Sequence, residues 1–225
     1  MKVVITAATQ MEWQQIKTQL HPQLLDINND LEVIFHTSGI GVMAATFSLQ
    51  QIISEEKPEL VIQVGIAGAF PDQLQLCVVV VVKEDQPGDL LVEENGRLND
   101  LFDMDFLAAD DAPYLNKKLP NPWLEHYPIN AKKVTAVTIN EITTNTARIA
   151  QLQNKYGAAL ETMEGAALHY VCLQMNIPFL QIRAISNEVG ERNKQHWQIK
   201  EALQNLSATV IDFMLDLQKQ AAAKK

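Results

Sequence analysis

Residues 158–184, AALETMEGAALHYVCLQMNIPFLQIRA, place two short apolar runs on either side of a helical pattern. The apolar side chains of the middle segment recur at helical spacing and form one face. They are Met163, Ala166, Ala167, Tyr170 and Val171. The flanking runs, 158–161 and 179–184, have the length of buried strands. A strand, a helix and a second strand in this order are typical of a parallel sheet covered by helices.

The same alternation continues through the rest of the chain. Further strands are expected at residues 3–7, 31–37, 60–64, 76–82 and 133–137, and helices at 11–20, 42–55, 146–155, 163–175 and 195–218. We therefore predict an α/β fold, a three-layer sandwich whose central, mostly parallel, twisted sheet is flanked by helices. Residues 85–129 are polar and rich in proline, so we expect an irregular excursion there, and residues 221–225 are expected to fray. No linker is visible, and residues 1–225 are expected to form a single domain.

Composition narrows the classes of partner. The net charge is −9 and no stripe of lysine and arginine interrupts the acidic background, which disfavours nucleic acid. No apolar stretch approaches the roughly 20 residues that span a bilayer, and the start has no cleavage pattern, so we expect a cytoplasmic protein without membrane contact. The five histidines are scattered, and neither GxxxxGK[ST] nor GxGxxG occurs, so no metal and no cofactor is expected.

Ligands of open α/β sheets bind beyond the carboxyl ends of the strands. The unusual segments of this chain fall at such ends: 8–12, 38–41, 65–69, 138–143, 162–164 and 186–190. Taken singly, each has an ordinary explanation. The glycines commonly mark turns, and Glu12 and Glu164 commonly complement helix dipoles. Their coincidence at one rim of the sheet predicts a binding site.

Several of these segments resemble the nucleoside phosphorylase and nucleosidase superfamily. The similarity covers nearly the whole chain and rests on residues 8–12, Ser38-Gly39-Ile40-Gly41, Gly65-Ile66-Ala67-Gly68, Thr162-Met163-Glu164-Gly165-Ala166-Ala167 and Arg183-Ala184-Ile185-Ser186-Asn187. It looks closest to the methylthioadenosine/S-adenosylhomocysteine nucleosidases. Within that group, residues 185–190 followed by Arg192 and Trp197 resemble the futalosine hydrolases of menaquinone biosynthesis.

The resemblance implies a role for each position. Glu12 would activate water, and Glu164 would hold the ribose hydroxyls above Met163. Ile142 would line the base pocket, at a position where an aromatic ring is common. Further substrate contacts are implied for Ala67, Gly68, Thr162 and Ser186. A homodimer or higher homo-oligomer is also implied.

Two residue types point to the acceptor and the base. The loop at residues 8–12 has no arginine for phosphate and carries Glu12, which would repel that anion, so water is favoured. Asn187 replaces the aspartate of adenosine-type nucleosidases. Its NH₂ can donate to a 6-oxo group while its C=O accepts from N7–H, a pattern that suits hypoxanthine. Together, Glu12 and Asn187 are the expected catalytic residues.

The expected reaction is hydrolysis of the N-glycosidic bond of futalosine, which gives hypoxanthine and dehypoxanthine futalosine. Arg192, Lys194 and His196 are candidates for binding the carboxylate of the 5′ substituent. Three alternatives stay open: a methylthioadenosine/S-adenosylhomocysteine nucleosidase, an inosine phosphorylase, and a catalytically inactive nucleoside-binding or scaffold protein.

Overall fold

The computed structural model describes residues 1–25 and 31–223. Its strands are β1 Lys2–Ala7, β2 Glu32–Thr37, β3 Leu60–Ala69, β4 Val79–Asp85, β5 Leu91–Glu94, β6 Arg97–Asp100, β7 Leu119–Pro120, β8 Lys132–Thr138, β9 Leu160–Thr162 and β10 Phe179–Glu188. Its α-helices are α1 Gln10–Leu25, α2 Val42–Glu56, α3 Thr146–Tyr156, α4 Gly165–Met175 and α5 Ile199–Ala223. A 3₁₀ turn, η1, spans Lys194–His196.

The main sheet is mixed, and part of it closes on itself. Its strand order is β10-β4-β8-β9-β3-β1-β2, and an additional pairing joins β10 to β3. Five strands therefore form a ring, from which the parallel strands β1 and β2 extend. Within the ring, β4 runs antiparallel to β10, and β9 runs antiparallel to β3. The α/β prediction is confirmed, whereas the predicted three-layer sandwich with a mostly parallel sheet is corrected to a mixed sheet that closes on itself in part.

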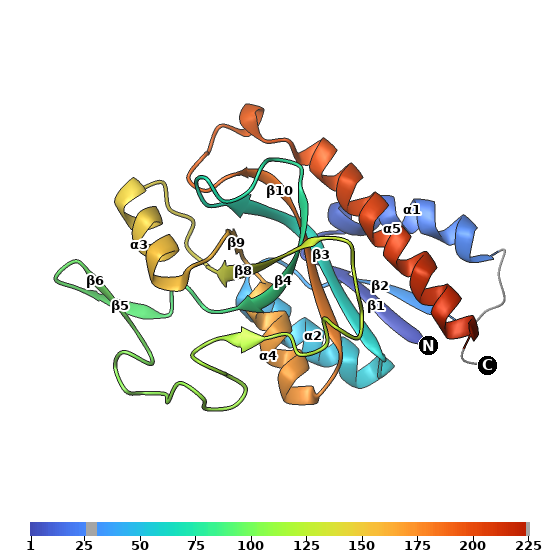
Figure 1. The fold of residues 1–225 in the computed structure, drawn as a ribbon, viewed down its shortest axis with the longest axis horizontal. Helices are drawn as coiled ribbons and strands as arrows, with labels where there is room; N and C mark the ends of the chain where they lie inside the picture. Colours follow the sequence, from blue (N-terminus) through green and yellow to red (C-terminus); the bar gives the residue numbers. More distant parts are fainter. Residues whose placement is uncertain (26–30, 224–225) are drawn as a thin grey trace.

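The interior of the ring is narrow and is filled by small side chains, as expected of a closed sheet with few strands. One cluster of buried residues draws on all five of its strands. It consists of Ala67, Ala69, Val80, Val82, Val134, Ala136, Leu160 and Ile185. Helices cover the outside: α1 packs with α5 on one side, and α2 packs with α4 on the other (Figure 1).

Helix ends follow local capping chemistry. The side chain of Asn145 accepts hydrogen bonds from the backbone N–H groups of Ala147 and Arg148 at the start of α3. Gly157 ends the same helix in the left-handed conformation, with φ of 59°. These two residues fix the length of α3, close to the range that the sequence predicts.

Some expected boundaries were wrong, and tertiary contacts explain why. Strands β3 and β10 continue past residues 64 and 184 because they pair with each other to Ala69 and Glu188. The expected strand at 76–82 begins only at residue 79, since Cys77 has a φ of 64°. The expected helix at 195–218 is divided, because Trp197 is extended between η1 and α5.

The excursion at 85–129 is only partly irregular. It contains the hairpin of β5 and β6, and strand β7, which pairs with β4. At the C-terminal end, α5 continues to Ala223, and residues 224–225 of the expected frayed tail lie outside the described residues. Within residues 1–25 and 31–223, no helix has both the length and the apolar character needed to cross a membrane.

Candidate active site

A cavity of about 320 Å³ opens where β1, β3, β9 and β10 end. All nine residues predicted to form the site line it. They are Glu12, Ala67, Gly68, Ile142, Thr162, Met163, Glu164, Ser186 and Asn187. They come from five separate segments of the chain. The spacing of the strands, and not proximity in sequence, therefore brings them together.

Glu12 lies in the first turn of α1 and is only 8% exposed. One carboxylate oxygen, Oε2, accepts from the backbone N–H and the hydroxyl of Thr9, each at 3.0 Å, as in a capping box. The other, Oε1, accepts from the Ile66 N–H of β3 at 3.2 Å. Glu12 therefore has the expected role at a helix start. The hydrogen bond from Ile66 also fixes the position of its carboxylate beside the cavity.

Gly65 leaves space between the carboxylate of Glu12 and the guanidinium of Arg183. It pairs in register with Arg183, whose side chain is 1% exposed and donates to Gln63 Oε1. A Cβ atom at position 65 would lie closer than 3.0 Å to Arg183 Nη1 and to Glu12 Oε1. The glycine therefore provides clearance inside β3, and the predicted end of the strand at residue 64 was wrong.

Glu164 immediately precedes α4 and is 6% exposed. Its Oε1 accepts from the Gly41 N–H at 2.9 Å, and Gly41 reaches this position with a φ of 87°. Burial raises the pKa of the Glu164 carboxyl above its ordinary value, as does the charge of Glu12, while Arg183 and the Gly41 N–H oppose the rise. Two buried carboxylates thus share one cation.

Hydroxyl groups hold the start of α4. Thr138 Oγ1 accepts from the Ala166 N–H at 2.7 Å and bonds to Asp85 Oδ1 at 2.9 Å, while Thr162 Oγ1 accepts from the Gly165 N–H at 3.2 Å. The free N–H groups of a helix start need such partners. Thr162, predicted to contact substrate, therefore also orients the turn that carries Glu164.

Asn187 lies inside β10, not beyond the end of the strand that was predicted at 179–184. The register between β10 and β3 shifts between Ile185 and Asn187, so Ser186 is the extra residue of a bulge. The Ser186 hydroxyl donates to Asn187 Oδ1 at 2.7 Å, and Asn187 Nδ2 donates to the Glu188 carbonyl at 2.8 Å. One amide hydrogen and one oxygen lone pair are left for a ligand.

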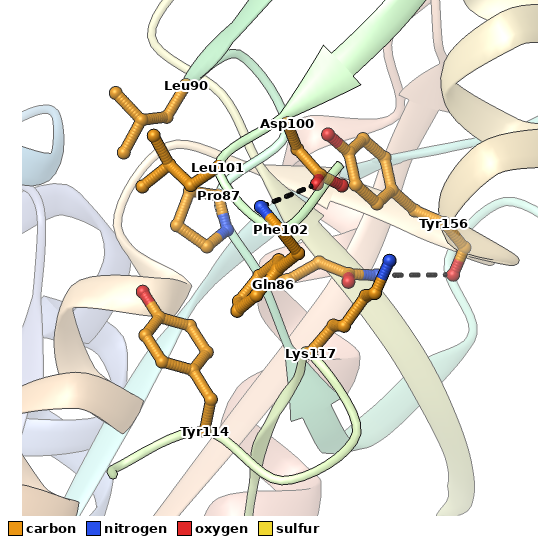
Figure 2. A pocket seen from close by; sticks show the side chains of 9 residues that line it. All are labelled: Gln86, Pro87, Leu90, Asp100, Leu101, Phe102, Tyr114, Lys117 and Tyr156. Carbon is orange, nitrogen blue, oxygen red and sulfur yellow. Dashed lines mark hydrogen bonds between the residues drawn. The ribbon is translucent and has the colours of Figure 1, made fainter. Parts of the chain in front are cut away.

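A second cavity, of about 20 Å³, is lined by residues of the segment 85–129 together with Tyr156 (Figure 2). Gln86, Tyr114 and Tyr156 are among its walls, and Gln86 Nε2 donates to the Tyr156 carbonyl at 3.2 Å. This volume is about that of one water molecule, so the space is too small for a nucleoside. Among the described residues, no group of three or more His, Cys, Asp or Glu side chains is placed to hold a metal ion.

Comparison with known proteins shows the family to which the chain belongs. A family model described as "Phosphorylase superfamily" matches residues 23–218. The chain belongs to this superfamily. A futalosine hydrolase of Thermus thermophilus is 30% identical over 79% of this chain and 79% of its own length. A 5′-methylthioadenosine/S-adenosylhomocysteine nucleosidase of Maridesulfovibrio salexigens is 26% identical over 72% of this chain and 71% of its own length.

Among solved structures, the fold is similar to the nucleosidase of Colwellia psychrerythraea in complex with adenine. The TM-score is 0.75, with 21% identity, and the match covers 95% of this chain and 94% of the other. That similarity concerns the fold. The predicted membership of the nucleoside phosphorylase and nucleosidase superfamily is confirmed.

Sequence reasoning missed two acidic residues that line this cavity, Glu161 and Glu191. Glu161 precedes Thr162 in β9, is 8% exposed and lines the cavity. A charged side chain in a short apolar run was the available signal, but it was interpreted as the end of the strand. Of the three basic residues considered for the 5′ substituent, Arg192 lines the cavity, near Trp197. Lys194 and His196 belong to the exposed turn η1.

The crowding at Gly65 gives a testable prediction. Gly65→Ala is expected to lower the free energy of unfolding by about 1–3 kcal/mol, since buried groups must move. Displacement of Glu12 should lower turnover on the order of a hundredfold. Chemical denaturation and steady-state kinetics measure the two effects. Gly96→Asn is the control, because nothing lies within 4 Å of that position and asparagine tolerates its φ of 73°. Full turnover in Gly65→Ala would contradict the role of this clearance.

Proposed function

We propose that this protein hydrolyses the N-glycosidic bond of futalosine, releasing hypoxanthine and leaving dehypoxanthine futalosine. Its superfamily and its nucleosidase relatives make the chain an N-glycosyl hydrolase. The choice of substrate is the proposal. It is carried by Asn187, which faces the cavity with one N–H and one lone pair uncommitted. The relative from Thermus thermophilus, a futalosine hydrolase, supports the same choice.

Water is the proposed acceptor. Glu12 takes a proton from water as the oxygen attacks C1′, and the pair of electrons of the C1′–N9 bond moves to the base. The departing base is a 6-oxopurine that gains its proton from the surroundings, so nucleoside and water give free base and free sugar. Glu164 holds the ribose hydroxyls and thereby keeps C1′ in front of Glu12.

The electrostatics of the cavity favour water over phosphate. Its lining near α1 consists of Ala8, Thr9, Met11 and the carboxylate of Glu12, with no basic side chain in that segment. Arg183 is the nearby cation, but it donates to Gln63 Oε1 and its charge already stabilises the carboxylate of Glu164. A phosphate at this position would face a buried negative charge in a region of low dielectric constant.

The carboxylated 5′ substituent needs a cation and an apolar surface. Arg192 and Trp197 offer both at the mouth of the cavity, with the guanidinium carbon 5.9 Å from the ring centroid. Their position supports Arg192 over Lys194 and His196 as the partner of that carboxylate.

The expected homo-oligomer stays a prediction. Ile40, Met43 and Phe47 are 63%, 87% and 70% exposed, and the last two are one turn apart on α2. Ile40 also lines the cavity. This apolar surface is where a second copy would be expected to pack.

The substrate and the acceptor can be tested together. The purified protein is incubated with futalosine, methylthioadenosine or inosine, with and without phosphate, and the base and sugar products are identified. We expect hypoxanthine from futalosine at a rate that phosphate does not change. A sugar 1-phosphate whose formation rises with phosphate would contradict hydrolysis. Release of adenine from methylthioadenosine faster than of hypoxanthine from futalosine would favour the alternative function, methylthioadenosine/S-adenosylhomocysteine nucleosidase.

The role of Glu12 predicts a large kinetic effect. Glu12→Gln keeps the shape of the side chain but removes the base, so turnover should fall at least about a hundredfold. Glu201→Gln is the matched control, because Glu201 also lies in the first turn of a helix, α5, but outside the cavity. If both variants kept normal turnover, Glu12 would be no more than a helix-terminus charge.

Asn187 predicts a change in selectivity. Against a 6-aminopurine, the NH₂ of Asn187 would face another NH₂. Asn187→Asp should therefore lower the ratio of kcat/KM for futalosine over its 6-amino analogue about tenfold, within the 1–3 kcal/mol range of a mispaired buried group. An unchanged ratio would mean that Asn187 does not contact the base.

A further inference from the structure

Glu161 is a buried carboxyl group that the reaction described above does not use. It lies on β9, is 8% exposed and lines the cavity. Its Oε2 is buried, and no described protein group donates a hydrogen bond to it. A buried polar atom without a partner is costly, and here it belongs to a carboxyl group on a residue that lines the cavity, which makes this group a candidate for a ligand contact.

The sheet aligns this carboxyl group with Asn187. Glu161 pairs with Gly68 on β3, and Gly68 pairs on its other side with Asn187 on β10. Residues in register on neighbouring strands point to the same face. A Cβ atom at position 68 would lie 3.5 Å from Glu161 Cγ and 3.4 Å from Asn187 Nδ2. The carboxyl group and the amide therefore lie on either side of a glycine whose missing side chain leaves room between them.

Two atoms distinguish a 6-oxopurine from a 6-aminopurine. At position 6 the first presents an acceptor and the second a donor, and at position 1 the first presents N–H and the second a bare nitrogen. Asn187 can contact only positions 6 and 7 at once. A neighbouring carboxylate is an acceptor that matches N1–H.

We propose that Glu161 is a second specificity-determining residue, whose carboxylate accepts the N1–H of the 6-oxopurine while Asn187 contacts O6 and N7. The inference deepens the proposed function and rests on its choice of base. Glu161 and Asn187, on either side of Gly68, then bind positions 1, 6 and 7 along one edge of the purine.

The charge of Glu161 gives this contact a pH dependence. Burial raises the pKa of the carboxyl to about 7, and Arg192 from the loop after β10 opposes the rise. Its partners in the sheet, Gly68 and Val137, are uncharged, as is Asn187. Above this pKa the carboxylate accepts from N1–H. Below it the acid donates, which suits the bare N1 of a 6-aminopurine. Preference for hypoxanthine over adenine should therefore increase as the pH rises through about 7.

The raised pKa of Glu161 also distinguishes a ligand-binding role of this residue from a structural one. A carboxyl whose folded pKa lies above its unfolded value opposes folding, and the penalty grows as the pH rises from the unfolded pKa to the folded one. Removing the group should leave thermal stability unchanged or higher at neutral pH. A structural role predicts the opposite.

The test uses binding of the free bases hypoxanthine and adenine, measured by calorimetry below and above about pH 7. Wild type should prefer hypoxanthine, increasingly so at the higher pH. Glu161→Val removes the acceptor and should reduce that preference about tenfold. Glu161→Gln retains a carbonyl acceptor, so it should keep part of the preference but lose its pH dependence. Glu84→Gln is the control, since Glu84 pairs with Lys118 outside the cavity and should leave the preference unchanged.

The proposal is overturned if Glu161→Val keeps the wild-type preference and its pH dependence, if the variant melts at a clearly lower temperature, or if wild type prefers adenine. Because free bases carry no 5′ substituent, these outcomes do not depend on futalosine being the substrate. Failure to hydrolyse futalosine, with hypoxanthine still preferred, would refute only the proposed substrate.

Discussion

The site depends on the buried guanidinium of Arg183, which fits beside β3 because residue 65 is a glycine. Arg183 on β10 and Gly65 on β3 are partners in register, and the missing side chain at Gly65 lets Arg183 approach the carboxylate of Glu12. Two buried carboxylates near one another would otherwise favour their neutral forms. The charge of Arg183 opposes the rise in the pKa of Glu164 and so favours its carboxylate form where the sugar is expected. The long pairing of β3 with β10 thus sets the charge of the cavity as well as its shape.

The sequence predicted which segments gather at the site better than it predicted their local conformation. All nine predicted residues line one cavity because strands of an α/β sheet end at a common rim, a rule that needs no knowledge of contacts. The predicted strands ended before residues 65–69 and before Asn187 because glycine and asparagine favour turns locally. Here, cross-strand pairing and the clearance for Arg183 outweigh that preference.

Other features depend on contacts between distant residues and could not be predicted from local patterns. The ring closes through β9, whose antiparallel pairing with β3 involves only Gly68 and Ala69. Glu161 was missed for the same reason: within its strand it is one charged residue in an apolar run. Its register with Gly68 and Asn187 becomes visible only when three strands are placed side by side.

The bulge at Ser186 has an evolutionary consequence. Ser186 has no partner on β3, so deleting it would leave Ile185 opposite Ala67 and Asn187 opposite Gly68, and Asn187 would keep its place at the cavity. Arg183, which lies before the bulge, would keep its register with Gly65, and Glu12 and Glu164 belong to other segments. The change would be chemical: without the Ser186 hydroxyl, Asn187 Oδ1 would lose the hydrogen bond that it accepts and would have both lone pairs free. A deletion at this position can thus alter the group presented to the cavity without a substitution of Asn187.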